Sequence, residues 1–215
     1  MLTELSREHE RPLRFWCRFL GVELADLLEP GVRVVPHTGF RDYHGAWIFE
    51  YRQAWILSVP AELVPELREA AAAFRPQPEW DLVTARRLFG ERVDRIIGPA
   101  YHGYLAPERF RPFALPEVRP LTADDEPALS RLREACTDTA WSHAGIDPRR
   151  PTPRMGVWLD GCLAAVAQNE ILSPGVVSPG VVTHPYFRGR GAGKAAVSAV
   201  TAPALERGEL ALYQT

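Results

Sequence analysis

A glycine-rich stretch late in the sequence has the residue types that bind an anion. Three glycines alternate in the segment Arg188-Gly189-Arg190-Gly191-Ala192-Gly193-Lys194. Where side chains are absent at alternate positions, the backbone turns tightly and its N–H groups converge on one point. An apolar stretch precedes the segment and a helix-favouring stretch follows it, so the first N–H groups of that helix are expected to face the same ligand. The pattern indicates a pyrophosphate site, to which Arg188 and Arg190 are expected to add charge-assisted hydrogen bonds.

The spacing of the glycines separates this loop from two common phosphate-binding motifs. A Walker loop requires a glycine five residues before the Gly-Lys pair and a Ser or Thr after it, but Arg188 and Ala195 stand at those places. The dinucleotide fingerprint requires its third glycine three positions after the second, so only a shifted or alanine variant of it fits here. A glycine-rich strand-to-helix turn without a ligand is the remaining alternative, although its glycines destabilise a fold.

The elements that position this loop are expected over residues 117–215. The hydrophobic pattern predicts a short strand at 117–119, a helix from 123 to about 138, strands at 154–159, 162–172 and 176–183, a helix at 194–207 and a strand at 210–213. Residues 122–125 resemble a capping box, and Asp160-Gly161 is a strong signal for a hairpin turn. The loop therefore connects a strand inside a sheet to a helix.

The first part of the sequence predicts a separate domain of mixed helices and strands. A hairpin is expected at 46–51 and 54–59, helices at 14–28, 61–74 and 81–89, and a further strand at 92–97. Prolines then recur at Pro107, Pro112, Pro116 and Pro120, a frequency that neither a helix nor a central strand sustains. We therefore expect one domain at 1–110, a linker at 111–116 and a second domain at 117–215.

Composition excludes several classes of function. The chain has 215 residues, 46% of them apolar, and a formal net charge of −2 with no long run of one sign, which argues against a nucleic-acid binder. No apolar stretch approaches the roughly 20 residues of a membrane helix, and the first residues are not signal-like, so a cytoplasmic protein is expected. The odd number and wide spacing of the cysteines, Cys17, Cys136 and Cys162, indicate free, buried thiols. No histidine has metal-ligand spacing, so no metal is predicted.

Around the loop the sequence resembles the GNAT superfamily of acyl-CoA N-acyltransferases. The signature of that family is Arg or Gln, two residues, Gly, one residue, and then Gly or Ala, which Arg188, Gly191 and Gly193 match. Residues 181–187 are similar to the family's fourth strand and its approach to the loop, and the resemblance covers about residues 116–215. It implies an α+β fold, a mostly antiparallel twisted sheet with flanking helices. Residues 1–110 lie outside it and are expected to form a smaller α+β domain, interpreted as a degenerate domain of the same ancestry.

The resemblance also implies an activity and a set of binding residues. It implies an enzyme, an N-acetyltransferase that moves the acetyl group of acetyl-CoA to a primary amine of a small molecule or protein. The backbone of Val181, Val182 and Thr183 is then expected to pair with the pantetheine arm. The loop amides are expected to hold the pyrophosphate, namely those of Arg188, Gly189, Arg190, Gly191, Ala192, Gly193 and Lys194. A module that binds acetyl-CoA or coenzyme A without catalysis is the alternative.

Catalysis requires a group that removes a proton from the acceptor amine. Glu170, at the end of a predicted strand beside the expected cleft, is the candidate base, and a solvated strand end is its alternative interpretation. Family members continue past their fifth strand with a helix and two strands, which supply an acid. Because the sequence ends at Thr215, the acetyl-CoA-binding domain is expected to be C-terminally incomplete, either truncated or completed by a partner. Strand 210–213 is then an apolar edge that invites aggregation or pairing with another chain, for instance in a homodimer.

Overall fold

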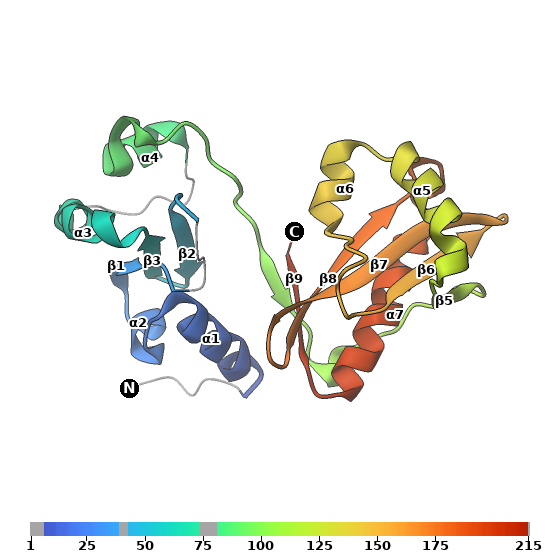
Figure 1. The fold of residues 1–215 in the computed structure, drawn as a ribbon. Helices are drawn as coiled ribbons and strands as arrows, with labels where there is room; N and C mark the ends of the chain where they lie inside the picture. Colours follow the sequence, from blue (N-terminus) through green and yellow to red (C-terminus); the bar gives the residue numbers. More distant parts are fainter. Residues whose placement is uncertain (1–6, 39–42, 74–80, 215) are drawn as a thin grey trace. The chain divides into compact units, whose positions relative to one another are not determined.

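The chain forms two compact units, Met1–Ala100 and Tyr101–Thr215, which are described separately here (Figure 1). In the computed structural model, residues 7–38, 43–73 and 81–214 are described. The boundary between the units lies before residue 101. Residues 101–110, which the proline pattern assigns to the first domain, therefore cluster with the second unit.

The first unit consists of a small sheet and short helices. Its elements are α1 (Arg7–Leu20), α2 (Leu24–Leu28), β1 (Gly31–Pro36), β2 (Trp47–Tyr51), β3 (Ala54–Val59), α3 (Val64–Ala73) and α4 (Leu82–Phe89). The sheet has the order β1-β3-β2, with β1 parallel and β2 antiparallel to β3. Every residue of β3 is buried, so the central strand forms the core of this unit. The expected hairpin at 46–59 is confirmed.

Two expectations for the first unit are wrong. The helix predicted at 14–28 is interrupted at Gly21, whose φ of +68° is a left-handed conformation and whose absent side chain leaves room for Thr38. The strand predicted at 92–97 does not form, and among the described residues no strand of either sheet pairs with that stretch. Strand β1, which the hydrophobic pattern does not predict, joins the sheet as a parallel edge strand.

The second unit is a six-stranded sheet with helices on both faces. Its elements are β4 (His102–Tyr104), β5 (Val118–Pro120), α5 (Glu126–Ala135), α6 (Asp138–Ala144), β6 (Arg154–Leu159), β7 (Cys162–Ser173), β8 (Val176–Thr183), α7 (Ala192–Glu206) and β9 (Leu210–Gln214). The strand order is β4-β9-β8-β7-β6-β5, and every neighbouring pair is antiparallel except β8 and β9. The predicted fold class, a mixed α+β protein with a mostly antiparallel sheet, is confirmed.

Local signals explain why these elements begin and end where they do. Thr122 and Asp125 form the capping box expected before α5, and Asp160 and Gly161 turn the chain between β6 and β7 with positive φ angles. Helix α6, which was not predicted separately, is capped by the Thr137 side chain and closed by Gly145 in the left-handed conformation.

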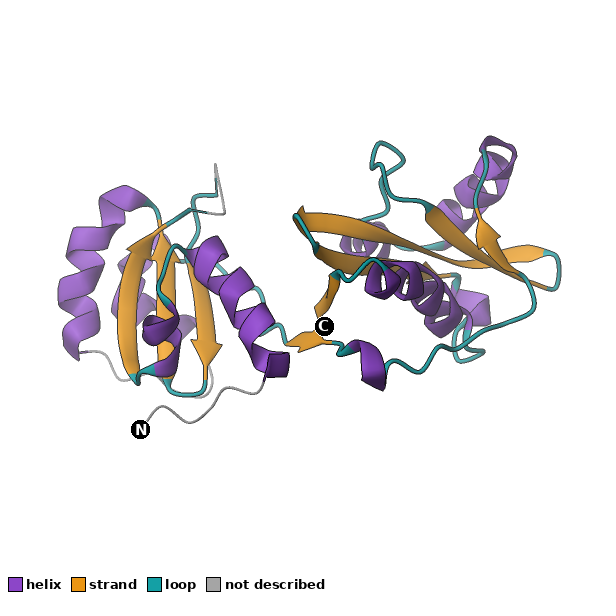
Figure 2. Ribbon diagram, turned by 90° about the horizontal axis from the view of Figure 1, so that it is seen from below, coloured by secondary structure: helices purple, strands orange, loops and turns teal. Residues whose placement is uncertain are grey.

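Helices lie on both faces of the sheet (Figure 2), and each face has its own hydrophobic core. Helices α5 and α6 pack on one face against Leu163, Val166 and Val182. Helix α7 packs on the opposite face against Val157, Ala165 and Ala167. Successive strand residues alternate between these cores, so side chains near the end of β8 divide between the two faces.

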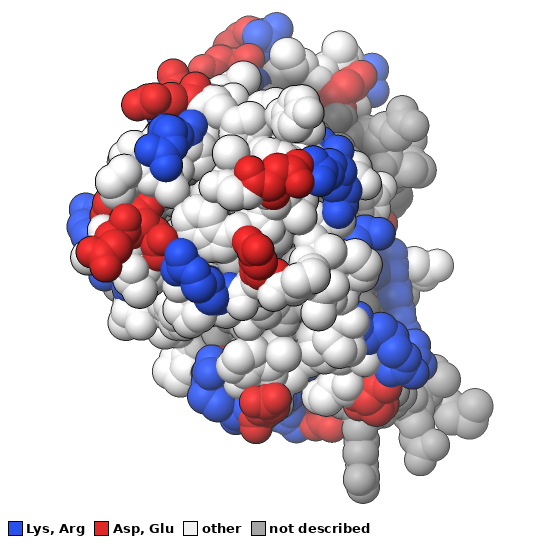
Figure 3. Space-filling view, turned by 90° about the vertical axis from the view of Figure 1, so that its right-hand side faces the viewer, with Lys and Arg blue, Asp and Glu red and all other residues white. Residues whose placement is uncertain are grey.

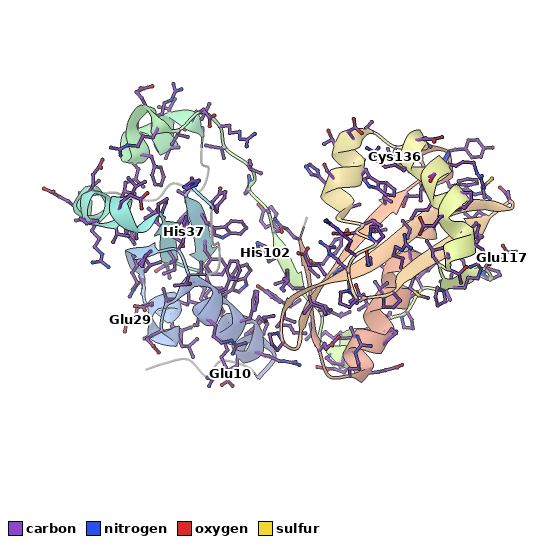
Figure 4. All side chains as sticks on the ribbon, in the orientation of Figure 1. Glu10, Glu29, His37, His102, Glu117 and Cys136 are labelled. Atoms are coloured by element: carbon purple, nitrogen blue, oxygen red, sulfur yellow. The ribbon has the colours of Figure 1, made fainter. Side chains whose placement is uncertain are left out.

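The expectation of an exposed edge at β9 is also wrong. Strand β4 pairs antiparallel with β9, from His102 opposite Gln214 to Tyr104 opposite Leu212, and Figure 4 shows His102 on β4. This pairing covers the edge with backbone partners from the same chain. The reason for expecting β9 to pair with another chain, and hence the argument for a homodimer, is thereby removed.

Candidate functional site

The three glycines of the loop are required for three different physical reasons. Gly189 has φ +78° and open space where a side chain would lie, so only its backbone conformation favours glycine. Gly191 has φ +84°, and a Cβ atom there would lie 2.8 Å from the ring of Phe113. Gly193 has no unusual φ, but its Cβ would lie 2.8 Å from Thr183 Oγ1. The third glycine therefore allows α7 to approach the end of β8 closely.

Helix α7 begins in this loop with its N–H groups available to a ligand. Gly191 is the N-cap, and no side chain caps the helix. The first N–H groups of a helix have no acceptor within it, and the helix dipole places partial positive charge at the same end. The α7 N-terminus, held against β8 by Gly193, therefore has the chemistry of an anion cradle.

Hydrogen bonds fix which way each backbone group of β8 points. The N–H of His184, just beyond β8, donates to Ala164 O at 2.8 Å, and Ala165 lies opposite Thr183 in the register with β7. Because consecutive residues of a strand point their backbone groups to opposite sides, Val182 also faces β7, whereas Val181 and Thr183 face away from it. The hydrogen bond from Leu210 N to Gly175 O, 2.8 Å long, agrees with this alternation. Gly175 faces β9, and residues an even number of positions along the chain from it, such as Val181 and Thr183, point their backbone groups to the same side.

The side of β8 that faces β9 is unpaired over most of its length. Only Val176 and Val177 pair with β9, opposite Leu210 and Ala211. Among the described residues, no strand pairs with residues 178–183 on that side. Pro179 has no N–H to donate, and its backbone points to the same unpaired side as that of Val181, as expected of a proline on a strand edge. We call residues 178–183 the open edge of β8.

The structure thus separates the three strand residues expected to bind the pantetheine arm. Val181 and Thr183 bring their backbone N–H and C=O groups to the open edge, next to the start of α7. Val182 points its backbone toward β7, and its side chain is 4% exposed in the core beneath α5 and α6. The backbone of Val182 is therefore not at the open edge.

The two arginines of the loop differ in their surroundings. Arg190 NH1 lies 2.8 Å from Asp160 Oδ2, and its guanidinium stacks over the Phe187 ring at 5.2 Å from the centroid. Arg190 is therefore engaged with the β6–β7 turn. Burial raises the pKa of the Cys136 thiol, which Figure 4 labels, and the charges of Arg188 and Arg133 partly offset that rise. Lys194 is exposed on the first turn of α7.

Glu170 lies too far along the sheet to contact Val181 or Thr183 directly. It is opposite Ser178, three residues before Val181, which corresponds to about 10 Å of strand. Its carboxylate lies 3.1 Å from Arg150 NH2, and the Glu170 side chain is half exposed. With residues 150–152, it lines a small pocket of about 200 Å³.

Helix α6 is tied tightly to β8 beside this pocket. A Cβ at Gly180 would lie 1.9 Å from the carbonyl oxygen of Ala144, the last residue of α6, so only glycine fits there. Arg150 donates to the carbonyl of Gly145, and the buried amide of Gln168 accepts from Asp147 N at 2.9 Å and donates to Thr152 O at 2.8 Å. These bonds fasten the segment after α6 to the sheet on the face opposite α7.

The rest of the described surface carries no other concentrated chemistry. The face seen in Figure 3 has basic and acidic side chains interspersed. Within residues 7–38, 43–73 and 81–214, no three His, Cys, Asp or Glu side chains are grouped to bind a metal, and no helix has the length and apolar character to cross a membrane. The cysteines are free thiols as expected, but Cys162 is exposed rather than buried, because it begins β7 directly after the hairpin turn.

Comparisons with known proteins find matches among solved structures only. No protein-family model matches the chain, and no curated protein is similar to it. Among solved structures, a GCN5-related N-acetyltransferase from Kribbella flavida is similar at 22% identity and a TM-score of 0.40, with 54% of this chain and 47% of that one covered. An acetyltransferase from the GNAT family from Colwellia psychrerythraea is similar at 16% identity and a TM-score of 0.43, with 54% and 45% covered.

A third match is the GNAT domain of PAT from S. lividans, at 18% identity and a TM-score of 0.37, with 43% of this chain and 66% of that one covered. The alignments thus span less than two thirds of each of these structures. In structure, this chain is similar to several proteins of the GNAT family over 43–54% of its length.

Proposed function

We propose that the second unit is an N-acetyltransferase domain that binds acetyl-CoA and transfers its acetyl group to a primary amine. The observation that carries this proposal is the proximity of the open edge of β8 to the uncapped N-terminus of α7. An unpaired strand edge offers alternating N–H and C=O groups to an extended, amide-containing chain. A helix N-terminus offers unbonded N–H groups to phosphates. A pantetheine arm joined to a pyrophosphate requires both.

The residues present fit such a ligand. The cradle consists of the backbone from Gly189 to Lys194, where side chains are absent at the positions that turn or approach β8. Val181 and Thr183 direct their backbone groups to the edge beside it. When bound, acetyl-CoA supplies an activated acyl group. The N–H groups of the open edge are then the candidate donors for the negative charge that develops on the acyl oxygen.

The candidate base is Glu170, whose role is a proposal of the same kind. About 10 Å of strand separates it from Val181, so it acts through a water molecule or on the acceptor itself. We expect Glu170→Gln to lower kcat by about 10² to 10⁴ with little change in acetyl-CoA affinity. Glu126→Gln is the matched control, because Glu126 is a similarly exposed carboxylate paired with an arginine, Arg154. Equal rates for the two variants would remove Glu170 from the mechanism.

The proposal is tested by thiol release from acetyl-CoA in the presence of a panel of primary amines, including amino acids, polyamines and peptides. Turnover with at least one amine, and its loss in a Gly193→Val variant that still melts cooperatively, is the expected result. Gly193 is chosen because any side chain there meets Thr183 Oγ1 at the junction of strand and helix. Binding of acetyl-CoA without turnover of any amine would refute catalysis, and absence of binding would refute the whole proposal.

A module that binds coenzyme A without catalysis is the second candidate. The ion pair between Glu170 and Arg150 favours it, because an engaged carboxylate about 10 Å of strand away from Val181 is poorly placed as a base. Calorimetry with acetyl-CoA, run beside the thiol-release assay, separates the two functions. Acetyl-CoA binding that persists while every amine of the panel stays unreacted is the result expected of the module.

A further inference from the structure

An aromatic ring from the proline-rich connector lies against the anion cradle. The position of a Cβ atom at Gly191 lies 2.8 Å from Cε1 and 2.9 Å from Cζ of Phe113. The backbone N–H of Phe113 donates to Ser198 Oγ at 3.0 Å, so the connector is attached to α7 two turns after the helix begins. The loop therefore lies between Thr183 at the end of β8 and Phe113 on the connector.

Phe113 is not a core residue, although it is anchored. Its side chain is 42% exposed, whereas Leu115, two residues later, packs against the hydrophobic core beneath α7. An exposed aromatic ring beside unbonded helix N–H groups presents two kinds of binding chemistry together. The N–H groups bind phosphate, and the ring offers a face on which a purine or pyrimidine base stacks. This combination fits a nucleotide better than it fits an isolated phosphate.

We propose that Phe113 binds the adenine ring of the coenzyme by stacking, beside the phosphates at the start of α7. This inference rests on the proposed function, because it takes coenzyme A as the ligand of the loop. It assigns the nucleotide end of the ligand to Phe113 and its pantetheine end to Val181 and Thr183 on the open edge of β8. It also gives Gly191 a second role, since a side chain there would displace the ring.

The test compares two ligands that differ in the adenosine part, measured by calorimetry with the full chain. Coenzyme A contains adenosine 3′-phosphate joined through a pyrophosphate, whereas 4′-phosphopantetheine lacks this nucleotide and keeps a single phosphate. Phe113→Ala is expected to weaken coenzyme A binding about tenfold and to leave 4′-phosphopantetheine binding unchanged, whereas Phe113→Trp retains the affinity for both. Tyr101→Ala is the control for losing an exposed aromatic side chain from the same unit, because Tyr101 is 74% exposed. Thermal melts verify that each variant is folded.

Each result of this experiment has a distinct meaning. A loss confined to coenzyme A in Phe113→Ala supports stacking. Equal losses for both ligands would show that the ring only supports the loop through Gly191. Unchanged affinity for both ligands would show that the ring does not touch the ligand. Either of these two results overturns the inference, while the proposed function stands. Failure of the unaltered chain to bind coenzyme A overturns the proposed function, and the inference with it.

Discussion

Replacing Val181 by proline tests the open edge of β8 without removing a hydrogen bond of the fold. Proline has no N–H group, and the N–H of Val181 points to the side of β8 where the described residues provide no partner strand. The matched variant is Val182→Pro, in which the missing N–H faces Val166 of β7 instead. Both substitutions replace valine by proline in the same strand, so backbone restriction largely cancels in the comparison, whereas the buried side chain of Val182 adds to the loss of stability in Val182→Pro.

The expected difference follows from the acceptor that Val182→Pro leaves without a donor. Val166 is fully buried, and an unsatisfied buried carbonyl costs about 1–3 kcal/mol of the free energy of unfolding. For a chain of this size, each kcal/mol lowers Tm by about 2–4 °C, so Val182→Pro should melt about 2–12 °C below Val181→Pro. Val181→Pro should instead weaken acetyl-CoA binding about twofold to tenfold, the value of one hydrogen bond.

Thermal melts followed by circular dichroism and calorimetric titration with acetyl-CoA provide the two measurements. Equal Tm values for the two variants would mean that the N–H of Val181 is bonded within the fold and that the edge is not open. Unchanged acetyl-CoA affinity in Val181→Pro, with Tm near that of the unaltered chain, would place the pantetheine arm elsewhere.

Three further predictions follow from contacts around the site and its sheet. Gly180→Ala should lower the free energy of unfolding by about 1–3 kcal/mol, because its Cβ meets Ala144 O, whereas Gly103→Ala, with its nearest atom 3.8 Å away, should cost less in the same denaturant titration. Asp160→Asn should free Arg190 and tighten coenzyme A binding a few-fold at low salt, and weaker binding in calorimetry would contradict this. The hydrogen bond from Arg119 holds the pKa of Asp125 well below its ordinary value of 3.8, so its stabilising effect is present above pH 4 and is lost as the pH falls further. Melts between pH 7 and pH 2.5 should therefore show a smaller loss of Tm in Asp125→Asn, and equal slopes would refute that.

Features with local causes were predictable from the sequence. The β6–β7 hairpin follows from Asp160-Gly161, and the start of α5 follows from Thr122 and Asp125, because turn and cap residues act on their own neighbours. The glycine loop was likewise predictable as a strand-to-helix junction beside β8. The Thr137 cap before α6 is a signal of the same local kind, although α6 was not predicted as a separate helix.

Features that depend on distant residues were not predictable in this way. Strand β4 has only three residues, too few to show an alternating pattern, and it exists because β9 offers a partner more than a hundred residues away. The ion pair of Arg190 with Asp160 and the contact of Phe113 with Gly191 also join segments far apart in the sequence. Burial, hydrogen bonding and pairing of this kind arise only in the folded sheet, so composition and spacing contain no sign of them.

Amide hydrogen exchange measured by NMR, with and without coenzyme A, tests the central claim most directly. Without the ligand, the amides of Val181 and Thr183 should exchange faster than those of Gly180 and Val182, which face β7. Saturating coenzyme A should slow exchange at Val181, Thr183 and the first turn of α7, and should leave Gly180 and Val182 unchanged. Protection of Val181 and Thr183 before the ligand is added, or no change at these amides and at α7 after it, would contradict the account.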